Sequence, residues 1–163
     1  MTEIYIDADA CPVREEVYRV AARTHLGVLV VHNGSRPIRP PDQPGVRIVI
    51  VPDGPDAADD WIAERITPND ICVTGDIPLA KRCLDRGARA LDHKGQAWTD
   101  DNIGNALAGR EIARHMRETG MGGGGHAPLT RADRSRFLAA LDVAVTAAKR
   151  GPAVRIGPAP DHR

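Results

Sequence analysis

A chain of 163 residues is long enough to fold as one domain with a substantial core. Hydrophobic residues make up 42% of it but aromatic residues only 3%, so the core must be aliphatic and few rings remain to stack nucleic-acid bases. The 22 basic and 22 acidic residues cancel, which excludes a molecule-wide field that attracts polyanions. Contacts to a polyanion would have to come from local patches.

The cysteine pattern and the apolar runs indicate the cellular compartment of the protein. Cys11, Cys72 and Cys83 form neither a disulfide framework nor a metal-binding spacing, which fits a reducing cytosol. No run approaches the about 20 apolar residues of a membrane helix, and Asp7 and Asp9 interrupt the only candidate leader. We therefore expect a cytoplasmic protein without a membrane segment.

Short β-rich segments alternate with segments of helical period, a pattern typical of βαβ units and a parallel sheet. The predicted strands are residues 3–8, 28–33, 46–51, 70–75 and 88–91. After the first strand, Val13, Val17 and Val20 recur at helical spacing, with Pro12 at the first helical position and Gly27 at the exit. The sequence predicts an α/β three-layer sandwich with a mostly parallel central sheet of about five strands.

Proline marks the irregular and helical segments in the middle of the chain. The four prolines of segment 35–45 predict an ordered but irregular loop. One helix is predicted from Pro55 to Ile66, and another from Pro78 to Gly87.

The pattern becomes purely helical after the fifth strand. We expect a helix from about residue 99 to 120, then a glycine-rich loop over residues 120–128, then a final helix capped by Thr130. Residues 1–150 would form a single α/β domain, and residues 151–163 a frayed tail.

Acidic residues follow two of the predicted strands. Asp7 stands at the carboxyl end of the first strand and Asp76 at that of the fourth. Ligands of open parallel sheets bind outside the carboxyl ends of the strands, where the strand order reverses. If the fourth strand pairs beside the first, Asp7 and Asp76 will face each other.

A second group of acids begins the helix that follows the third strand. Asp56 and Asp60 lie one helical turn apart on one face, with Asp59 beside them. Repulsion among so many carboxylates is relieved by a hard divalent cation, which prefers oxygen ligands. The sequence thus predicts a Mg²⁺ or Mn²⁺ site that activates a water and stabilises a leaving phosphate oxygen. The candidate ligands are Asp7, Asp9, Asp56, Asp59, Asp60 and Asp76.

Each of these residues also has a simpler interpretation. Acids in the first turn of a helix complement its dipole by about 0.3–1 kcal/mol without any metal. Asp9 could cap the first helix, and Asp76 the helix that starts near Pro78. Cys11, just before a helix, is either a nucleophile with a lowered pKa or a small packed residue that supports the site.

Basic residues surround the same predicted rim. They could guide a phosphodiester backbone toward the acids, or could simply be solvated helix faces. The candidates are Lys94 with His93 after the fifth strand, Arg110 and Arg114 on the next helix, and Arg131 and Arg134 on the last.

Several stretches resemble one protein family over residues 3 to about 145. They read IYIDADACPVREEVYR, DAADDWI, VTGDIPLAKRCLDRGARAL, TDDNIGNAL, GREIARHMRETG and GGGGHAPLTRADRSRFLAALD. In these the chain resembles the YaiI/YqxD family, uncharacterised bacterial proteins with a PIN-like fold. The related PIN and NYN domains are metal-dependent nucleases whose acids come from the first strand, a helix and a T-x-D-like motif.

Carried over residue by residue, the resemblance assigns these acids to Asp7, to Asp56 with Asp59 or Asp60, and to Asp76. Thr74 would position a carboxylate or a water. The resemblance implies a Mg²⁺- or Mn²⁺-dependent phosphodiesterase that acts on RNA.

Two other functions stay open. IYIDADA resembles the D-x-D opening of haloacid-dehalogenase phosphatases, with Asp7 as nucleophile and Asp9 as general acid, but no suitable lysine-then-acid pair follows. A non-catalytic nucleic-acid- or protein-binding module is the other alternative. Neutral charge and scarce aromatic residues argue against strong sequence-independent binding of nucleic acid.

Overall fold

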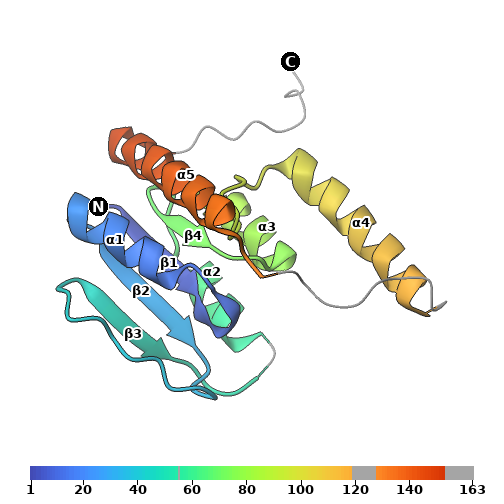
Figure 1. Ribbon diagram of the computed structural model, residues 1–163, viewed down its shortest axis with the longest axis horizontal. Helices are drawn as coiled ribbons and strands as arrows, with labels where there is room; N and C mark the ends of the chain where they lie inside the picture. Colours follow the sequence, from blue (N-terminus) through green and yellow to red (C-terminus); the bar gives the residue numbers. More distant parts are fainter. Residues whose placement is uncertain (55, 119–127, 153–163) are drawn as a thin grey trace.

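A five-stranded sheet in the order β3-β2-β1-β4-β5 forms the centre of the protein, and every pair of neighbouring strands is parallel. The computed structural model describes residues 1–54, 56–118 and 128–152 (Figure 1). The strands are β1 (Glu3–Asp7), β2 (Gly27–His32), β3 (Val46–Ile50), β4 (Ile71–Val73) and β5 (Arg89–Leu91). The predicted α/β fold with its parallel sheet is confirmed.

Helices cover both faces of this sheet. They are α1 (Arg14–Thr24), α2 (Ala57–Arg65), α3 (Ile77–Asp85), α4 (Asp100–Glu118) and α5 (Arg131–Arg150), with a 3-10 turn, η1 (Ala8–Ala10), before α1. One core layer joins the sheet to α1 and α5, and centres on Phe137 and Val17. The other joins it to α2, α3 and the start of α4, and centres on Ile62 and Leu79. The result is a three-layer sandwich.

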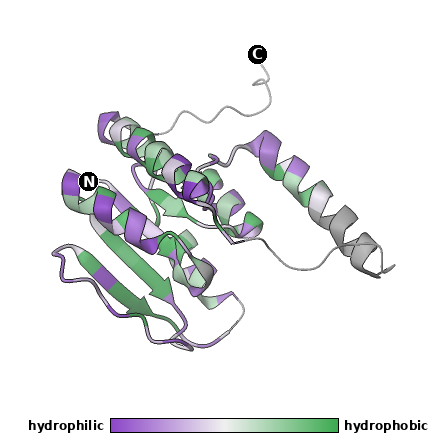
Figure 2. Cartoon of the chain, in the orientation of Figure 1, coloured by the Kyte–Doolittle hydropathy of each residue, from purple (hydrophilic) through white to green (hydrophobic). Residues whose placement is uncertain are grey.

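The central strands are apolar because both faces of the sheet are covered there. Figure 2 shows β2 as mostly hydrophobic, and its five residues after Gly27 are all buried. Along β1, Ile4 and Ile6 face α1 and α5, while Tyr5 faces α2 and α3. Alternation of side chains then directs Asp7 toward α2 and α3.

The strand order reverses between β1 and β4. The chain adds β2 and then β3 on one side of β1, and returns to place β4 on the other side. Ile6 of β1 pairs with Val73 of β4, so Asp7, the last residue of β1, and Thr74, the first after β4, lie side by side at the carboxyl ends of the two strands. This is the position where ligands of open α/β sheets bind.

The predicted limits of the first helix were wrong at both ends. Helix α1 begins at Arg14, after Val13, so Pro12 lies in the preceding turn. It ends at Thr24 because His25 adopts a left-handed conformation (φ 60°) and its N–H closes the last turn on the Ala21 carbonyl. Gly27, the predicted exit, is the first residue of β2.

The C-terminal part follows the prediction where it is described. Thr130 caps α5 through a reciprocal capping box with Asp133. The predicted glycine-rich loop over 120–128 and the tail over 151–163 lie almost entirely outside the described residues. Of the helices in the described ranges, none is long and apolar enough to cross a bilayer.

Candidate functional site

Thr74 connects Asp7 and Asp76 at the reversal point of the sheet. Its hydroxyl donates to Asp7 Oδ2 at 3.0 Å and accepts from the Asp76 N–H at 2.9 Å. Thr74 is fully buried, and both bonds are partly buried. Two acids 69 positions apart in the sequence are thereby held at the carboxyl ends of neighbouring strands.

Asp76 also serves the simpler role considered from the sequence. One of its carboxylate oxygens, Oδ1, accepts from the Leu79 N–H at 2.9 Å and caps α3. Helix α3 begins at Ile77, so Pro78 is its second residue, where no N–H is needed. A cap bond through one oxygen orients the carboxylate and leaves the other for a further ligand.

Asp59 shares the electrostatic environment of this pair. Burial, followed by the charges of Asp76, Asp7 and Asp56, raises the pKa of the Asp59 carboxyl to about 7. Burial likewise raises the pKa of Asp7, although the hydrogen bond from Thr74 opposes that shift. Near neutral pH the Asp59 carboxyl is therefore partly protonated, unless a bound cation replaces the proton.

The other predicted acids have partners or surroundings that differ from those of Asp7, Asp59 and Asp76. Asp60 forms an ion pair with Arg82 of α3 (2.7 Å), and both side chains are about half exposed. Asp56 is exposed at the N-terminal boundary of α2 and makes no side-chain cap bond. Asp9 lies within η1 and accepts from the Asn33 N–H at 3.2 Å.

The structure corrects the alternative role of Asp9 and bears on that of Cys11. The residue at the N-cap of α1 is Val13, so Asp9 does not cap this helix; it fixes the loop after β2 instead. Cys11 is buried, and burial raises the pKa of its thiol to about 12. A thiol in this environment stays protonated, which favours the packed residue over the nucleophile.

Sequence reasoning missed the support that Trp98 gives to the site. The indole Nε1 donates to the Thr74 carbonyl at 3.1 Å, behind the threonine that holds Asp7. His93, expected at the rim, packs its ring against Gly75, where a Cβ would lie 3.3 Å from Cε1. Burial lowers the pKa of His93, so the ring is neutral. The glycine between Thr74 and Asp76 was the available signal for this close approach.

The predicted cationic residues differ in whether they are paired within the protein or exposed. Arg134 donates to the Pro12 carbonyl at 2.8 Å and to Glu16 Oε1 at 3.0 Å, so it ties α5 to the start of α1. Arg131, the first residue of α5, and Lys94, in the loop after β5, are exposed. The side chains of Arg110 and Arg114 lie outside the described part of the structure.

The donor set suits a hard cation but is not assembled around one. Within residues 1–54, 56–118 and 128–152, no three His, Cys, Asp or Glu side chains are arranged to hold a metal ion. Asp7, Asp59 and Asp76 nevertheless supply oxygen donors only, the type that Mg²⁺ and Mn²⁺ prefer.

The chain is similar to a large group of bacterial sequences. A family model described as "Uncharacterized BCR, YaiI/YqxD family" matches residues 5–147. A UPF0178 protein of Parvibaculum lavamentivorans is 54% identical over 93% of this chain and 99% of its own length. A UPF0178 protein of Rhodospirillum rubrum is 56% identical over 91% of this chain and 99% of its own. No solved structure matches.

Proposed function

The chain belongs to the YaiI/YqxD family, and we propose that this member is a divalent-metal-dependent phosphodiesterase that cleaves RNA at the Asp7–Thr74–Asp76 rim. The observation that carries the proposal is the bridge by Thr74 between carboxylates from two neighbouring strands. It lies at the position of the sheet where α/β proteins place their ligands.

A bound metal ion would offset the repulsion among the carboxylates of this site. Asp7 and Asp59 are both shifted toward their protonated forms, first by burial and then by neighbouring acids. A divalent cation bound by Asp7, Asp59 and Asp76 would replace the proton and favour the ionised forms of Asp7 and Asp59. When bound, Mg²⁺ or Mn²⁺ would polarise a water and stabilise the leaving oxygen of the phosphodiester.

Other residues would orient the reacting groups. Thr74 fixes the rotamer of Asp7, and Trp98 fixes the backbone of Thr74. Exposed Arg131 and Lys94 are available to the phosphate backbone of a bound strand. Asp60 is left out of the proposed set because Arg82 neutralises it.

The test measures cleavage by the full-length chain. Labelled single-stranded RNA, single-stranded DNA and p-nitrophenyl phosphate are each incubated with Mn²⁺, Mg²⁺ or EDTA. We expect RNA cleavage with either metal and none with EDTA. Asp7→Asn and Asp76→Asn should each reduce the rate by at least about a hundredfold, because each removes a charged ligand.

Asp142→Asn is the matched control, since Asp142 pairs with Arg23 on α1, away from the rim. It should cleave RNA at the wild-type rate. Turnover of p-nitrophenyl phosphate without RNA cleavage would instead support the phosphatase alternative. Undiminished RNA cleavage by Asp7→Asn would show that the activity comes from elsewhere.

A further inference from the structure

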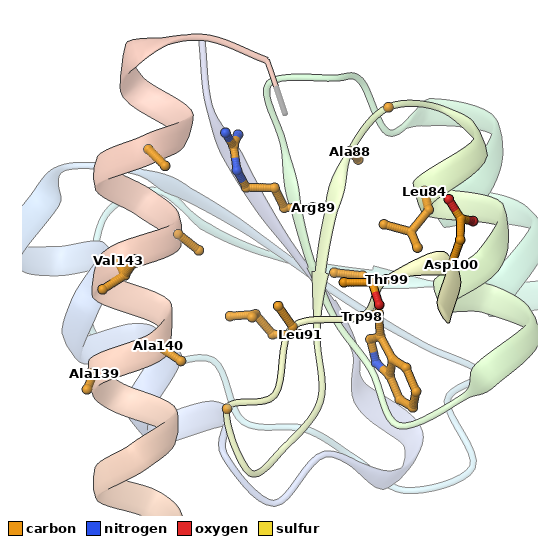
Figure 3. A pocket seen from close by; sticks show the side chains of 16 residues that line it. Leu84, Ala88, Arg89, Leu91, Trp98, Thr99, Asp100, Ala139, Ala140 and Val143 are labelled. Atoms are coloured by element: carbon orange, nitrogen blue, oxygen red, sulfur yellow. The ribbon is translucent and has the colours of Figure 1, made fainter. Parts of the chain in front are cut away.

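A cavity of about 560 Å³ lies at the β5 edge of the sheet, and none of the rim carboxylates lines it (Figure 3). Strand β5 forms its floor, α5 one wall, and the end of α3 with the start of α4 the other. Nine of its 16 lining residues are alanine or glycine, so the cavity exists because the sequence places small side chains where two layers meet. Ala140 of α5 points across it toward Leu91 of β5.

Arg89 places a cation at one end of this mostly apolar cavity, and Asp100, at the start of α4, lines the opposite wall, where it pairs with Lys81 (3.7 Å). Its Nη1 donates to the Gly151 carbonyl at 3.3 Å, and no carboxylate of the described residues forms an ion pair with it. Partial burial lowers the pKa of the guanidinium, because it disfavours the charged form. An anion in the cavity would supply the missing charge.

We propose that this cavity binds a small amphipathic carboxylate, with its aliphatic chain along β5 and its carboxylate on the guanidinium of Arg89. Ligand pockets of about 300–1,000 Å³ have mostly apolar walls and a few polar groups that fix orientation, and this cavity has that composition. The planar guanidinium matches a carboxylate with two parallel hydrogen bonds. The site is independent of the proposed nuclease activity and is tested without it.

Trp98 gives the proposal a direct spectroscopic readout. It lines the cavity, and its indole Nε1 donates to the Thr74 carbonyl. The only other tryptophan, Trp61, stands on α2 with Arg65 over its ring. A Trp61→Phe background therefore leaves Trp98 as the single tryptophan, at the wall of the cavity, and excitation at about 295 nm avoids the tyrosines.

The experiment titrates the full-length Trp61→Phe chain with decanoate, decanol and decylammonium below their micellar concentrations. Trp98 fluorescence and isothermal calorimetry report binding. We expect saturable, one-to-one binding of decanoate, at least about tenfold tighter than decanol, with decylammonium weakest. Arg89→Met should lower decanoate affinity to the level of decanol, because only the charged contact is lost.

Two further variants separate the cavity from general surface binding. Ala140→Leu fills the space at a half-exposed helix position and should weaken decanoate and decanol alike. Arg150→Met removes a cation that does not line the cavity and should change nothing. Circular dichroism melting of each variant verifies that it is folded.

The proposal is overturned by equal affinity of the wild-type cavity for decanoate and decanol, by unchanged binding in Ala140→Leu, or by no binding at all. Light scattering measures the oligomeric state and so tests whether a second copy of the chain occupies the cavity instead. A dimer that Ala140→Leu dissociates, without decanoate binding to the wild type, would identify the cavity as a subunit interface and would also overturn the proposal.

Discussion

Thr74 holds Asp7 by a 3.0 Å hydrogen bond across the boundary between β1 and β4. The same hydroxyl accepts from the Asp76 N–H, so one buried side chain fixes both acids of the candidate site. The pairing of β1 with β4 makes this contact possible. Its contributions to stability and activity can be measured by substituting Thr74.

Thr74→Val tests this double role while keeping the shape of the side chain. Loss of the hydroxyl leaves the Asp76 N–H without its partner and removes the bond that opposes the raised pKa of Asp7. We expect a loss of about 1–3 kcal/mol in the free energy of unfolding, measured by urea denaturation. Thr74→Ser keeps the hydroxyl and should retain the cleavage activity that Thr74→Val loses.

Asp59 should make the metal-free protein less stable as the pH rises. Its pKa is raised from 3.8 to about 7 in the folded state, so the folded protein binds more protons than the unfolded chain between these values. This contribution to stability is full below pH 4 and is lost as the pH rises through about 7. Thermal melts in EDTA from pH 5 to 8.5 measure it.

Asp59→Asn provides the comparison because it cannot ionise. Its melting temperature relative to wild type should increase from pH 5 to pH 8.5, whereas Asp142→Asn should run parallel to wild type. Parallel curves for wild type and Asp59→Asn would contradict the raised pKa of Asp59.

A divalent cation should reverse this loss of stability. Mn²⁺ that binds only the folded state stabilises it by about 2.7 kcal/mol at a hundred times its dissociation constant. The gain in melting temperature should be larger at pH 8 than at pH 5.5, because at low pH the metal competes with the proton on Asp59. The same Mn²⁺ effect in Asp7→Asn would show that the cation binds elsewhere.

The sequence predicted the location of the acids better than their individual roles. Strand positions follow from apolar runs and turn residues, and parallel topology then places Asp7 and Asp76 at one rim. Adjacent Asp59 and Asp60 have the same local signals, so only tertiary neighbours distinguish them: Arg82 pairs with Asp60, whereas burial beside Asp76 and Asp7 acts on Asp59. Propensities cannot reveal a long-range partner of this kind.

The end of α1 and the contact of Trp98 were both missed because residue spacing does not show them. His25 takes the left-handed position that glycine usually fills, so the helix ends without the expected glycine. Trp98 reaches Thr74 because the chain after β5 folds back: the Trp98 N–H donates to the Ala90 carbonyl. Neither feature has a signature in residue spacing.

Two glycine substitutions should shift stability in opposite directions. Gly95 has φ 91°, and an added Cβ would lie 2.7 Å from the Arg136 carbonyl oxygen, so Gly95→Ala must displace α5 from the loop after β5. Gly104 lies within α4 with nothing within 4 Å of an added Cβ. We expect Gly95→Ala to lower the free energy of unfolding by at least about 1–2 kcal/mol, and Gly104→Ala to raise it by roughly 0.5–1 kcal/mol. Urea denaturation of both variants measures the two changes. A wild-type midpoint for Gly95→Ala would mean that α5 does not pack against this loop in solution.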